Sequence, residues 1–267
     1  MRPILRWAGA KTQILTKLAS YYQDPKYKYI EPFCGSACLF LRLNPKRAVL
    51  GDMNSDLIGT YETVRSNPSD VHQAMQGWGL DAETYYKVRA GEGVHTDPIS
   101  KAARFLYLNR LCFNGIYRTN LSGKFNVPWG ATKFRAMLSL EELVSFSEAL
   151  KGVKLVSGDF AMCLQRVSAK TFVYLDPPYR VTSKRTFREY LPAGFAVDDL
   201  HRLRTAIIRI HESGAKFVLS YADSAEARTL GDGFQTVSTP VRRLVAGSAS
   251  SRTRVEELLI SNIEISQ

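Results

Sequence analysis

Several kinds of segment are missing from this chain of 267 residues, and each absence argues against a class of protein. No run of about 18 apolar residues occurs, so a membrane span is not expected. The stretch from Met1 to Lys11 carries charged residues and glycine in place of an apolar core, which argues against a signal peptide. We therefore expect a soluble, cytoplasmic protein with no membrane partner.

Cysteine is also scarce. The four cysteines form no CxxC pair and have no histidines near them at the spacing of a zinc site. We therefore expect neither a disulfide framework nor a bound metal, and we interpret the cysteines as small buried hydrophobic side chains.

Acidic residues are absent from three windows, residues 98–140, 177–188 and 233–255, although the chain as a whole has a net charge of +11. The basic residues of these windows are Lys101, Arg104, Arg110, Arg118, Lys124, Lys133, Arg135, Arg180, Lys184, Arg185, Arg188, Arg242, Arg243, Arg252 and Arg254. Segments of this composition can neutralise phosphate groups, which favours nucleic-acid binding. A solvated basic face on an unrelated protein is the alternative, and charge alone does not separate the two.

The segments that are present indicate an α/β fold. Residues 28–33 and 47–52 are predicted strands, joined by a glycine-containing turn and an apolar helical stretch, and the second strand ends in Asp52. This order is typical of the opening of a nucleotide-binding sheet. Further strands are predicted at residues 153–157, 171–175, 216–220, 235–240 and 256–263, the last at an edge or in a hairpin, and a helix at 197–213.

Between residues 56 and 150 the apolar spacing is mainly helical. Helices are predicted at residues 71–78, 82–89, 99–112 and 140–150. Between them lies the segment 117–129, in which Ser122-Gly123 predicts the turn of a β-hairpin. We therefore predict a sheet domain made of residues 1–58 and 151–267, split by a basic and mostly helical insertion, residues 59–150.

The motif with the most specific chemistry is Asp176-Pro177-Pro178-Tyr179, which follows an apolar strand. Two prolines end the strand, so the turn lies at the carboxyl edge of the sheet, where α/β proteins bind ligands. An exocyclic amine could donate its two hydrogens to Asp176 and to the Pro177 carbonyl, freeing its lone pair for attack on a methyl sulfonium. Tyr179 could then stack on the base. A simple Pro-Pro turn with an exposed aspartate is the alternative.

A second motif, residues 31–36 (EPFCGS), follows the first predicted strand. Gly35 lets the backbone approach a ligand closely, and Asp52 is placed to accept from both hydroxyls of a ribose. Many dinucleotide enzymes share such a pair, but the Gly-x-Gly-x-x-Gly of dehydrogenases is absent here.

In combination, these motifs resemble those of the Dam family of DNA adenine-N6 methyltransferases, the D12 class, along almost the whole chain and in the family's order. The matching segments are residues 7–11 (WAGAK), 31–35 (EPFCG), 52–58 (DMNSDLI), 105–118, 125–130 (FNVPWG), 176–179 (DPPY) and 250–259. The resemblance implies a Rossmann-like sheet that uses S-adenosylmethionine. It also implies that the helical insertion is a DNA-recognition domain containing the β-hairpin.

The resemblance further implies roles for individual residues. Catalysis falls to Asp176, Pro177 and Tyr179. Contacts with S-adenosylmethionine fall to Trp7, Lys11, Phe33, Gly35, Asp52, Asp159, Phe160 and Asp176. Contacts with double-stranded DNA fall to Arg6, Arg110, Phe113, Asn114, Arg118, Asn120 and Lys124. Taken singly, Trp7 and Phe113 could be core aromatics and Lys11 a solvated cation.

The expected reaction is direct methyl transfer to an adenine flipped out of the duplex, without a covalent enzyme intermediate. A cytosine-C5 methyltransferase would need a nucleophilic cysteine, usually after proline, and no cysteine follows a proline here. Methylation of an RNA or a protein amide is one rival, although such enzymes usually have asparagine in place of Asp176. A catalytically silent DNA-binding module is the other.

The match at Asn114 and Arg118 suggests GATC as the recognition sequence. We expect a monomer, with two molecules on one DNA site as the alternative. The basic segment 181–190 is interpreted as a loop that orders over DNA.

Overall fold

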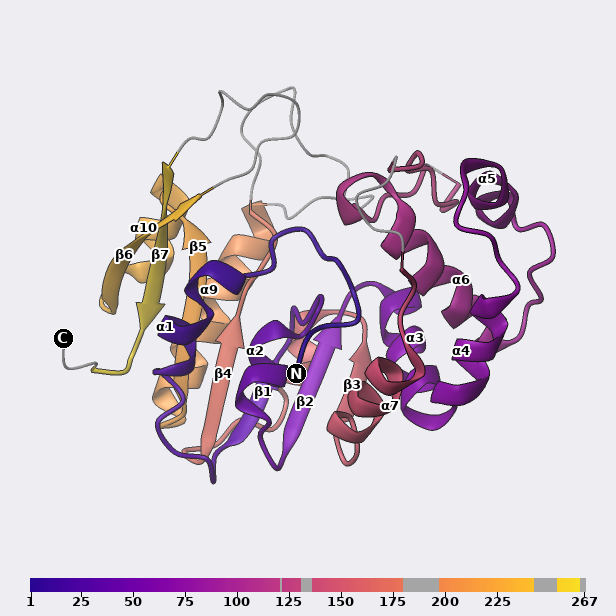
Figure 1. The fold of residues 1–267 in the computed structure, drawn as a ribbon. Coiled ribbons are helices and arrows are strands. Elements are labelled where there is room, and N and C mark those ends of the chain that lie inside the picture. Colours follow the sequence, from indigo (N-terminus) through magenta and orange to yellow (C-terminus); the bar gives the residue numbers. More distant parts are fainter. Residues whose placement is uncertain (121, 131–135, 180–196, 243–253, 265–267) are drawn as a thin grey trace.

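The computed structural model describes residues 1–120, 122–130, 136–179, 197–242 and 254–264. Its centre is a seven-stranded sheet with the strand order β3-β2-β1-β4-β5-β7-β6 (Figure 1). The strands are β1 (Lys28–Glu31), β2 (Ala48–Asp52), β3 (Lys154–Ser157), β4 (Thr171–Leu175), β5 (Lys216–Ala222), β6 (Gln235–Arg242) and β7 (Arg254–Ser261). Strands β1 to β5 pair in parallel, and β7 is antiparallel to both of its neighbours. The predicted α/β sheet is therefore confirmed.

Apolar side chains on both faces of the sheet explain its central position. All five residues of β4 are buried, as expected for a parallel strand covered on both sides. Successive side chains alternate between the faces: Phe172 and Tyr174 belong to one buried cluster, and Val173 and Leu175 belong to the other.

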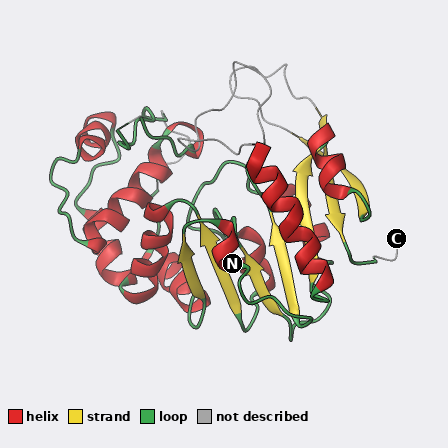
Figure 2. Cartoon of the chain, turned by 180° about the vertical axis from the view of Figure 1, so that it is seen from behind, coloured by secondary structure: helices red, strands yellow, loops and turns green. Residues whose placement is uncertain are grey.

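Helices complete a layer on each face of the sheet. The first buried cluster packs under α1 (Leu15–Ala19) and α2 (Cys38–Leu43). The second packs under α8 (Phe160–Cys163), α9 (Val197–Glu212) and α10 (Ala225–Gly231). In the view from behind, a long helix crosses in front of the strands (Figure 2). The result is a three-layer α/β sandwich whose strand ends are left open at the carboxyl edge.

Five helices follow one another between β2 and β3 and lie beside the β3 edge of the sheet (Figure 1). They are α3 (Ser55–Ser66), α4 (Pro68–Gln76), α5 (Ala82–Ala90), α6 (Pro98–Leu111) and α7 (Leu140–Ala149). Helix α6 starts where the Asp97 side chain accepts from the Ser100 amide, with Pro98 as its first residue. Helix α7 starts at a reciprocal capping box between Ser139 and Glu142.

Each helix and strand predicted from the sequence is present, with ends displaced by a few residues. For the strand at the carboxyl end, the hairpin expectation is correct and the edge expectation is wrong: β7 lies between β5 and β6, and β6 forms the edge. The short helices α1, α8 and α10 were not predicted, because two turns or fewer give little periodicity. The segment 117–129 forms a minimal hairpin with an antiparallel bridge between Thr119 and Phe125.

No helix in the described ranges is both long and apolar enough to cross a bilayer. Within the same ranges, no group of His, Cys, Asp or Glu side chains is arranged to hold a metal ion. The predicted segment 181–190 lies outside the described residues, as do the basic residues Lys133, Arg135, Arg180, Arg243 and Arg252.

A carboxylic acid is buried at the end of β1. Glu31 is only 3% exposed, and its Oε2 accepts from the Tyr29 hydroxyl at 2.8 Å. Burial raises the pKa of Glu31 to about 8, although the hydrogen bond from Tyr29 opposes the rise. This side chain is therefore mostly protonated at neutral pH in the folded protein.

We expect the folded protein to lose stability as the pH rises from about 5 to about 8. In this window the folded state keeps a proton on Glu31 that the unfolded chain, with an ordinary carboxyl pKa, has already lost. The contribution approaches about 1.4 kcal/mol per pH unit at most. Glu31→Gln keeps an uncharged acceptor for Tyr29 and should flatten the slope. Urea unfolding of both proteins across this pH range measures it, and parallel curves would contradict the assignment.

Candidate active site

The parallel strands bring acidic residues to one edge of the sheet. Asp52 ends β2, and Asp176 directly follows β4. Strand β5 runs beside β4 with Leu219 opposite Leu175, so Ser220 lies next to Asp176. The antiparallel β7 brings Glu257 opposite Ala222, at the same edge. Residues far apart in the sequence therefore meet at this edge of the sheet, where β2, β4 and β5 end and the antiparallel β7 begins.

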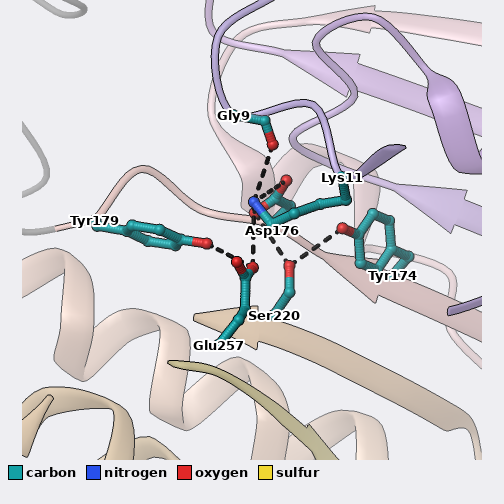
Figure 3. Close-up of polar contacts among 7 residues, drawn as sticks. All are labelled: Gly9, Lys11, Tyr174, Asp176, Tyr179, Ser220 and Glu257. Atoms are coloured by element: carbon teal, nitrogen blue, oxygen red, sulfur yellow. Dashed lines mark hydrogen bonds and ion pairs between the residues drawn. The ribbon is translucent and has the colours of Figure 1, made fainter. Parts of the chain in front are cut away.

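Asp176 is the centre of this cluster (Figure 3). The Lys11 ammonium donates to its Oδ1 at 2.7 Å and to its Oδ2 at 3.0 Å. The Ser220 hydroxyl donates to Oδ1 at 3.1 Å and lies 3.1 Å from the Tyr174 hydroxyl. Lys11 also donates to the Gly9 carbonyl at 3.0 Å. The amino-terminal segment is thus connected directly to the turn after β4.

Glu257 is a second carboxylate in the same cluster. It accepts from the Tyr179 hydroxyl at 2.7 Å and lies 3.4 Å from the Lys11 ammonium (Figure 3). The Tyr179 ring packs against Tyr221 with 4.9 Å between ring centroids, and the Lys11 ammonium lies 5.1 Å from the centre of the Tyr179 ring. The Tyr179 ring is therefore fixed by a hydrogen bond at its hydroxyl group and by contacts of the ring with Tyr221 and Lys11.

Burial and charge act in opposite directions on these groups. Burial raises the pKa of Asp176 above its ordinary value, and the Lys11 ammonium opposes that rise. Burial alone would lower the pKa of Lys11, but the negative groups around it, Asp176 first, raise it instead. Lys11 therefore keeps its positive charge at neutral pH and lies between the carboxyl groups of Asp176 and Glu257.

Asp52 is held by backbone amides at the end of β2. Its Oδ2 accepts from the Gly35 amide at 3.0 Å and its Oδ1 from the Asn54 amide at 2.9 Å. Burial raises the pKa of Asp52, and these two hydrogen bonds oppose the rise. Each oxygen keeps a further lone pair, so the carboxylate can still accept from the hydroxyls of a sugar.

The loop after β1 lies directly under Trp7. Gly35 has a φ of +44°, and a Cβ built on it would come within 2.6 Å of the Trp7 ring. The Gly35 carbonyl accepts from the Tyr61 hydroxyl at 2.6 Å. Ala37 also has a left-handed φ of 53°. Trp7 itself stacks on Tyr117, with 5.7 Å between ring centroids.

The remaining predicted cofactor residues form a group on the other side of the loop. Phe33 stacks on Phe160 with 5.4 Å between centroids. Asp159 caps α8 by accepting from the Ala161 amide, and it pairs with Arg202 at 2.6 Å. The Arg202 guanidinium also lies over the Phe160 ring, 4.9 Å from its centre. Asp159 thus already has two partners.

The predicted DNA contacts nearest the site are Arg6, near the amino terminus, and the residues at the end of α6 and just beyond it. The Arg6 amide donates to the Asn109 side chain at 2.9 Å, and the Arg6 carbonyl accepts from Asn109 at 2.7 Å. The Arg6 guanidinium donates to the Arg110 carbonyl at 3.1 Å. Just beyond α6, Phe113 is 43% exposed, and Asn114 adopts a left-handed φ of 55°. Segments 6–11 and 110–115 are therefore adjacent.

The other predicted DNA contacts lie in the minimal hairpin. The Arg118 Nε donates to the Asn126 side chain at 2.7 Å. The Asn120 Oδ1 accepts from the Ser122 amide, the Ser122 hydroxyl and the Lys124 amide, so it shapes the turn. The Lys124 side chain is exposed.

Four site residues were missed by the sequence reasoning: Tyr174, Ser220, Glu257 and Arg202. Ser220 is a buried polar residue among the apolar residues of β5, and Glu257 is a buried carboxylate next to the exposed Glu256 in β7. Such a residue signals a specific partner, since an unpaired buried carboxylate is costly. No role was predicted for either residue, although Glu257 lies in the matching segment 250–259. The pairing of β4 with β5 brings Ser220 to Asp176, and the pairing of β5 with β7 brings Glu257 to the same edge.

Gly35→Ala should displace Trp7 and strain the loop, because the added methyl group has no space and the left-handed φ disfavours a side chain. We expect the unfolding free energy to fall by about 1–3 kcal/mol. Chemical denaturation measures this loss. Gly59→Ala on α3, where an added Cβ meets nothing within 4 Å, is the matched control and should leave stability nearly unchanged. Equal stability of both variants would refute the contact.

Comparison with known proteins agrees with this geometry. A family profile described as "D12 class N6 adenine-specific DNA methyltransferase" matches residues 7–243. The chain is 32% identical over 272 residues to the type II methyltransferase M1.LlaDCHI of Lactococcus lactis subsp. cremoris, covering 98% of this chain and 95% of the relative. It is 34% identical over 288 residues to the type II methyltransferase M.MjaIII of Methanocaldococcus jannaschii, covering 98% and 99%. It is 31% identical over 264 residues to the DNA adenine methylase of Escherichia coli K12, covering 97% and 94%.

Proposed function

Because the chain belongs to the D12 class of N6 adenine-specific DNA methyltransferases, we propose that it transfers a methyl group from S-adenosylmethionine to an adenine flipped out of duplex DNA. One observation carries this proposal. A buried carboxylate, Asp176, lies at the open edge of the sheet beside an aromatic ring, Tyr179, and a backbone carbonyl that follows directly, Pro177.

This arrangement fits the chemistry of an exocyclic amine. The amine of adenine has two hydrogens to donate, and its lone pair is otherwise delocalised into the ring. Asp176 and the Pro177 carbonyl accept the two hydrogens, and Tyr179 stacks on the base. The nitrogen then forms a bond to the methyl carbon as the carbon–sulfur bond breaks. Asp176 accepts the proton that the nitrogen loses, a role favoured by the burial that raises its pKa.

Lys11 competes with the target amine in this scheme. Its ammonium donates to both oxygens of Asp176, and Ser220 donates to one of them. Because Oδ1 already has two donors, an incoming N–H group approaches Oδ2, where it shares the oxygen with Lys11 or replaces it. The protein contributes orientation and electrostatic stabilisation in a water-poor site.

The residues around the loop after β1 fit S-adenosylmethionine. When bound, this donor supplies a methyl group activated by a sulfonium charge. The Asp52 carboxylate accepts from the ribose hydroxyls, and the missing side chain of Gly35, whose amide donates to Asp52, makes room for the Trp7 ring beside it. The two carboxyl groups beside Lys11, those of Asp176 and Glu257, suit a cationic donor. Phe33, Asp159 and Phe160 are assigned to the adenine ring of the donor.

We assign DNA recognition to the helical segment, residues 59–150. Phe113 and Asn114 are exposed beside the catalytic edge, next to the partly buried Arg6 and Arg110. Arg118, Asn120 and Lys124 extend this surface along the hairpin. GATC is the recognition sequence proposed from the match at Asn114 and Arg118, and the protein is proposed to act as a monomer.

The proposed reaction is tested by incubating the protein with S-adenosylmethionine and unmethylated plasmid DNA, followed by modification-aware sequencing. We expect N6-methyladenine within one short motif. Asp176→Asn should lower the rate by at least about 100-fold, because it loses the charge that accepts the proton. Asp24→Asn, ahead of the first strand at the opposite edge, is the matched control and should keep full activity. Unmodified adenine after incubation with the wild type would reject the proposal.

Two basic residues should affect DNA binding differently. If Lys124 contacts only phosphate, Lys124→Ala should weaken binding to all duplexes and reduce the salt slope by about 1. If Arg118 reads a base edge, Arg118→Ala should lower discrimination between GATC and a single-substituted site by about 1–3 kcal/mol. Fluorescence anisotropy over a range of salt concentrations measures both. Identical behaviour of the two variants would contradict the division of roles.

A further inference from the structure

We propose that Glu257 is a positioning residue for methyl transfer, a role that rests on the proposed function of Asp176. Glu257 provides the carboxylate to which Lys11 turns when the target amine occupies Asp176. It also fixes the orientation of Tyr179 through the hydroxyl group of that ring.

The first argument is the burial of Glu257. This residue is only 6% exposed, although it belongs to a strand whose next residue toward the amino end, Glu256, is exposed on the opposite face. A buried carboxylate is costly unless it is paired. Within the described ranges, the polar partners of its side chain are the Tyr179 hydroxyl and the Lys11 ammonium. Both partners belong to the site.

The second argument is that the Lys11 ammonium lies closer to Asp176 than to Glu257. Its ammonium is 2.7 Å and 3.0 Å from the two oxygens of Asp176, and 3.4 Å from Glu257. If a target amine takes a position on Asp176, the ammonium loses a hydrogen bond in a buried place. A small movement toward Glu257 replaces that bond, so Glu257 lowers the cost of exchanging Lys11 for the amine.

The third argument is the geometry of Tyr179. Its hydroxyl donates to Glu257 at 2.7 Å, and its ring packs on Tyr221 at an angle of 50°. Figure 3 shows the ring extending from the turn toward Glu257, with Asp176 on the neighbouring side of the cluster. Rotation of the ring would break a hydrogen bond to a charged group, which is stronger than one between neutral groups. The stacking surface for the base is therefore fixed before the base arrives.

The charge of Glu257 is tested with Glu257→Gln. Glutamine keeps the size of the side chain and an oxygen that accepts from Tyr179, but it cannot attract Lys11 away from Asp176. We expect the single-turnover methylation rate, at saturating S-adenosylmethionine and DNA, to fall roughly tenfold. A duplex with 2-aminopurine at the target position, which lacks the 6-amino group and so does not displace Lys11, should show the wild-type rise in fluorescence on binding. Glu256→Gln, a neighbouring acid on the other face of β7, is the matched control and should match the wild type in both measurements.

A double-mutant cycle separates this role from a merely structural one. In a Lys11→Met background the ammonium is absent, so Glu257→Gln should change the rate by less than about twofold. A structural role would lower the rate by the same factor in both backgrounds. That result, or a wild-type rate for Glu257→Gln, would overturn the proposal.

Tyr179→Phe tests the orientation of the ring without altering Glu257. It keeps the stacking surface and removes only the hydroxyl, so the 2-aminopurine signal should fall while the melting temperature stays near that of the wild type. An unchanged signal would overturn this part of the proposal, even if Glu257→Gln did not fold. The wild type is assayed in parallel: its failure to form N6-methyladenine would reject the proposed function itself, whereas an active wild type with unaffected variants rejects only the role of Glu257.

Discussion

The ion pair between Lys11 and Asp176 is the interaction on which the site depends. It joins a residue near the amino terminus to the turn after β4, and both groups are largely removed from water. Such a pair is stable only where further groups satisfy the remaining hydrogen-bonding positions. Gly9, Ser220 and Glu257 do this. The ends of β4, β5 and β7 and the segment before α1 are thereby fixed relative to one another.

The fold itself was largely predictable from the sequence, because its signals are local. Apolar runs ending in Asp52 and in Asp176-Pro177-Pro178 marked two strand ends, and helical spacing marked α4 to α7. The order of strands in the sheet is not a local property. The position of β7 between β5 and β6 depends on which edges pair, and this is why the sequence left the last strand open between an edge and a hairpin.

The candidate site was predictable where a motif marks it. Lys11 and Asp176 were both expected at the site, and the structure brings them into contact. Ser220 and Glu257 could not be found in the same way, because single buried polar residues in strands show that a partner exists without showing which one. Asn120 shows the opposite difficulty. Its residue type suits a base contact, yet its side-chain oxygen already serves three donors of its own turn.

One feature of the amino-terminal segment links the two parts of the molecule mechanically. The Asn109 side chain, on α6, is hydrogen-bonded to both the backbone amide and the backbone carbonyl of Arg6. Arg6 therefore follows any displacement of this helix. Lys11, five positions further along, is fastened to Asp176 at the other end of the same short peptide. The segment therefore connects the helical region to the sheet through polar contacts at both of its ends. If a ligand bound at one end of this segment changes the affinity for a second ligand at the other end, thermodynamic linkage makes the effect reciprocal. The second ligand then changes the affinity for the first by the same factor.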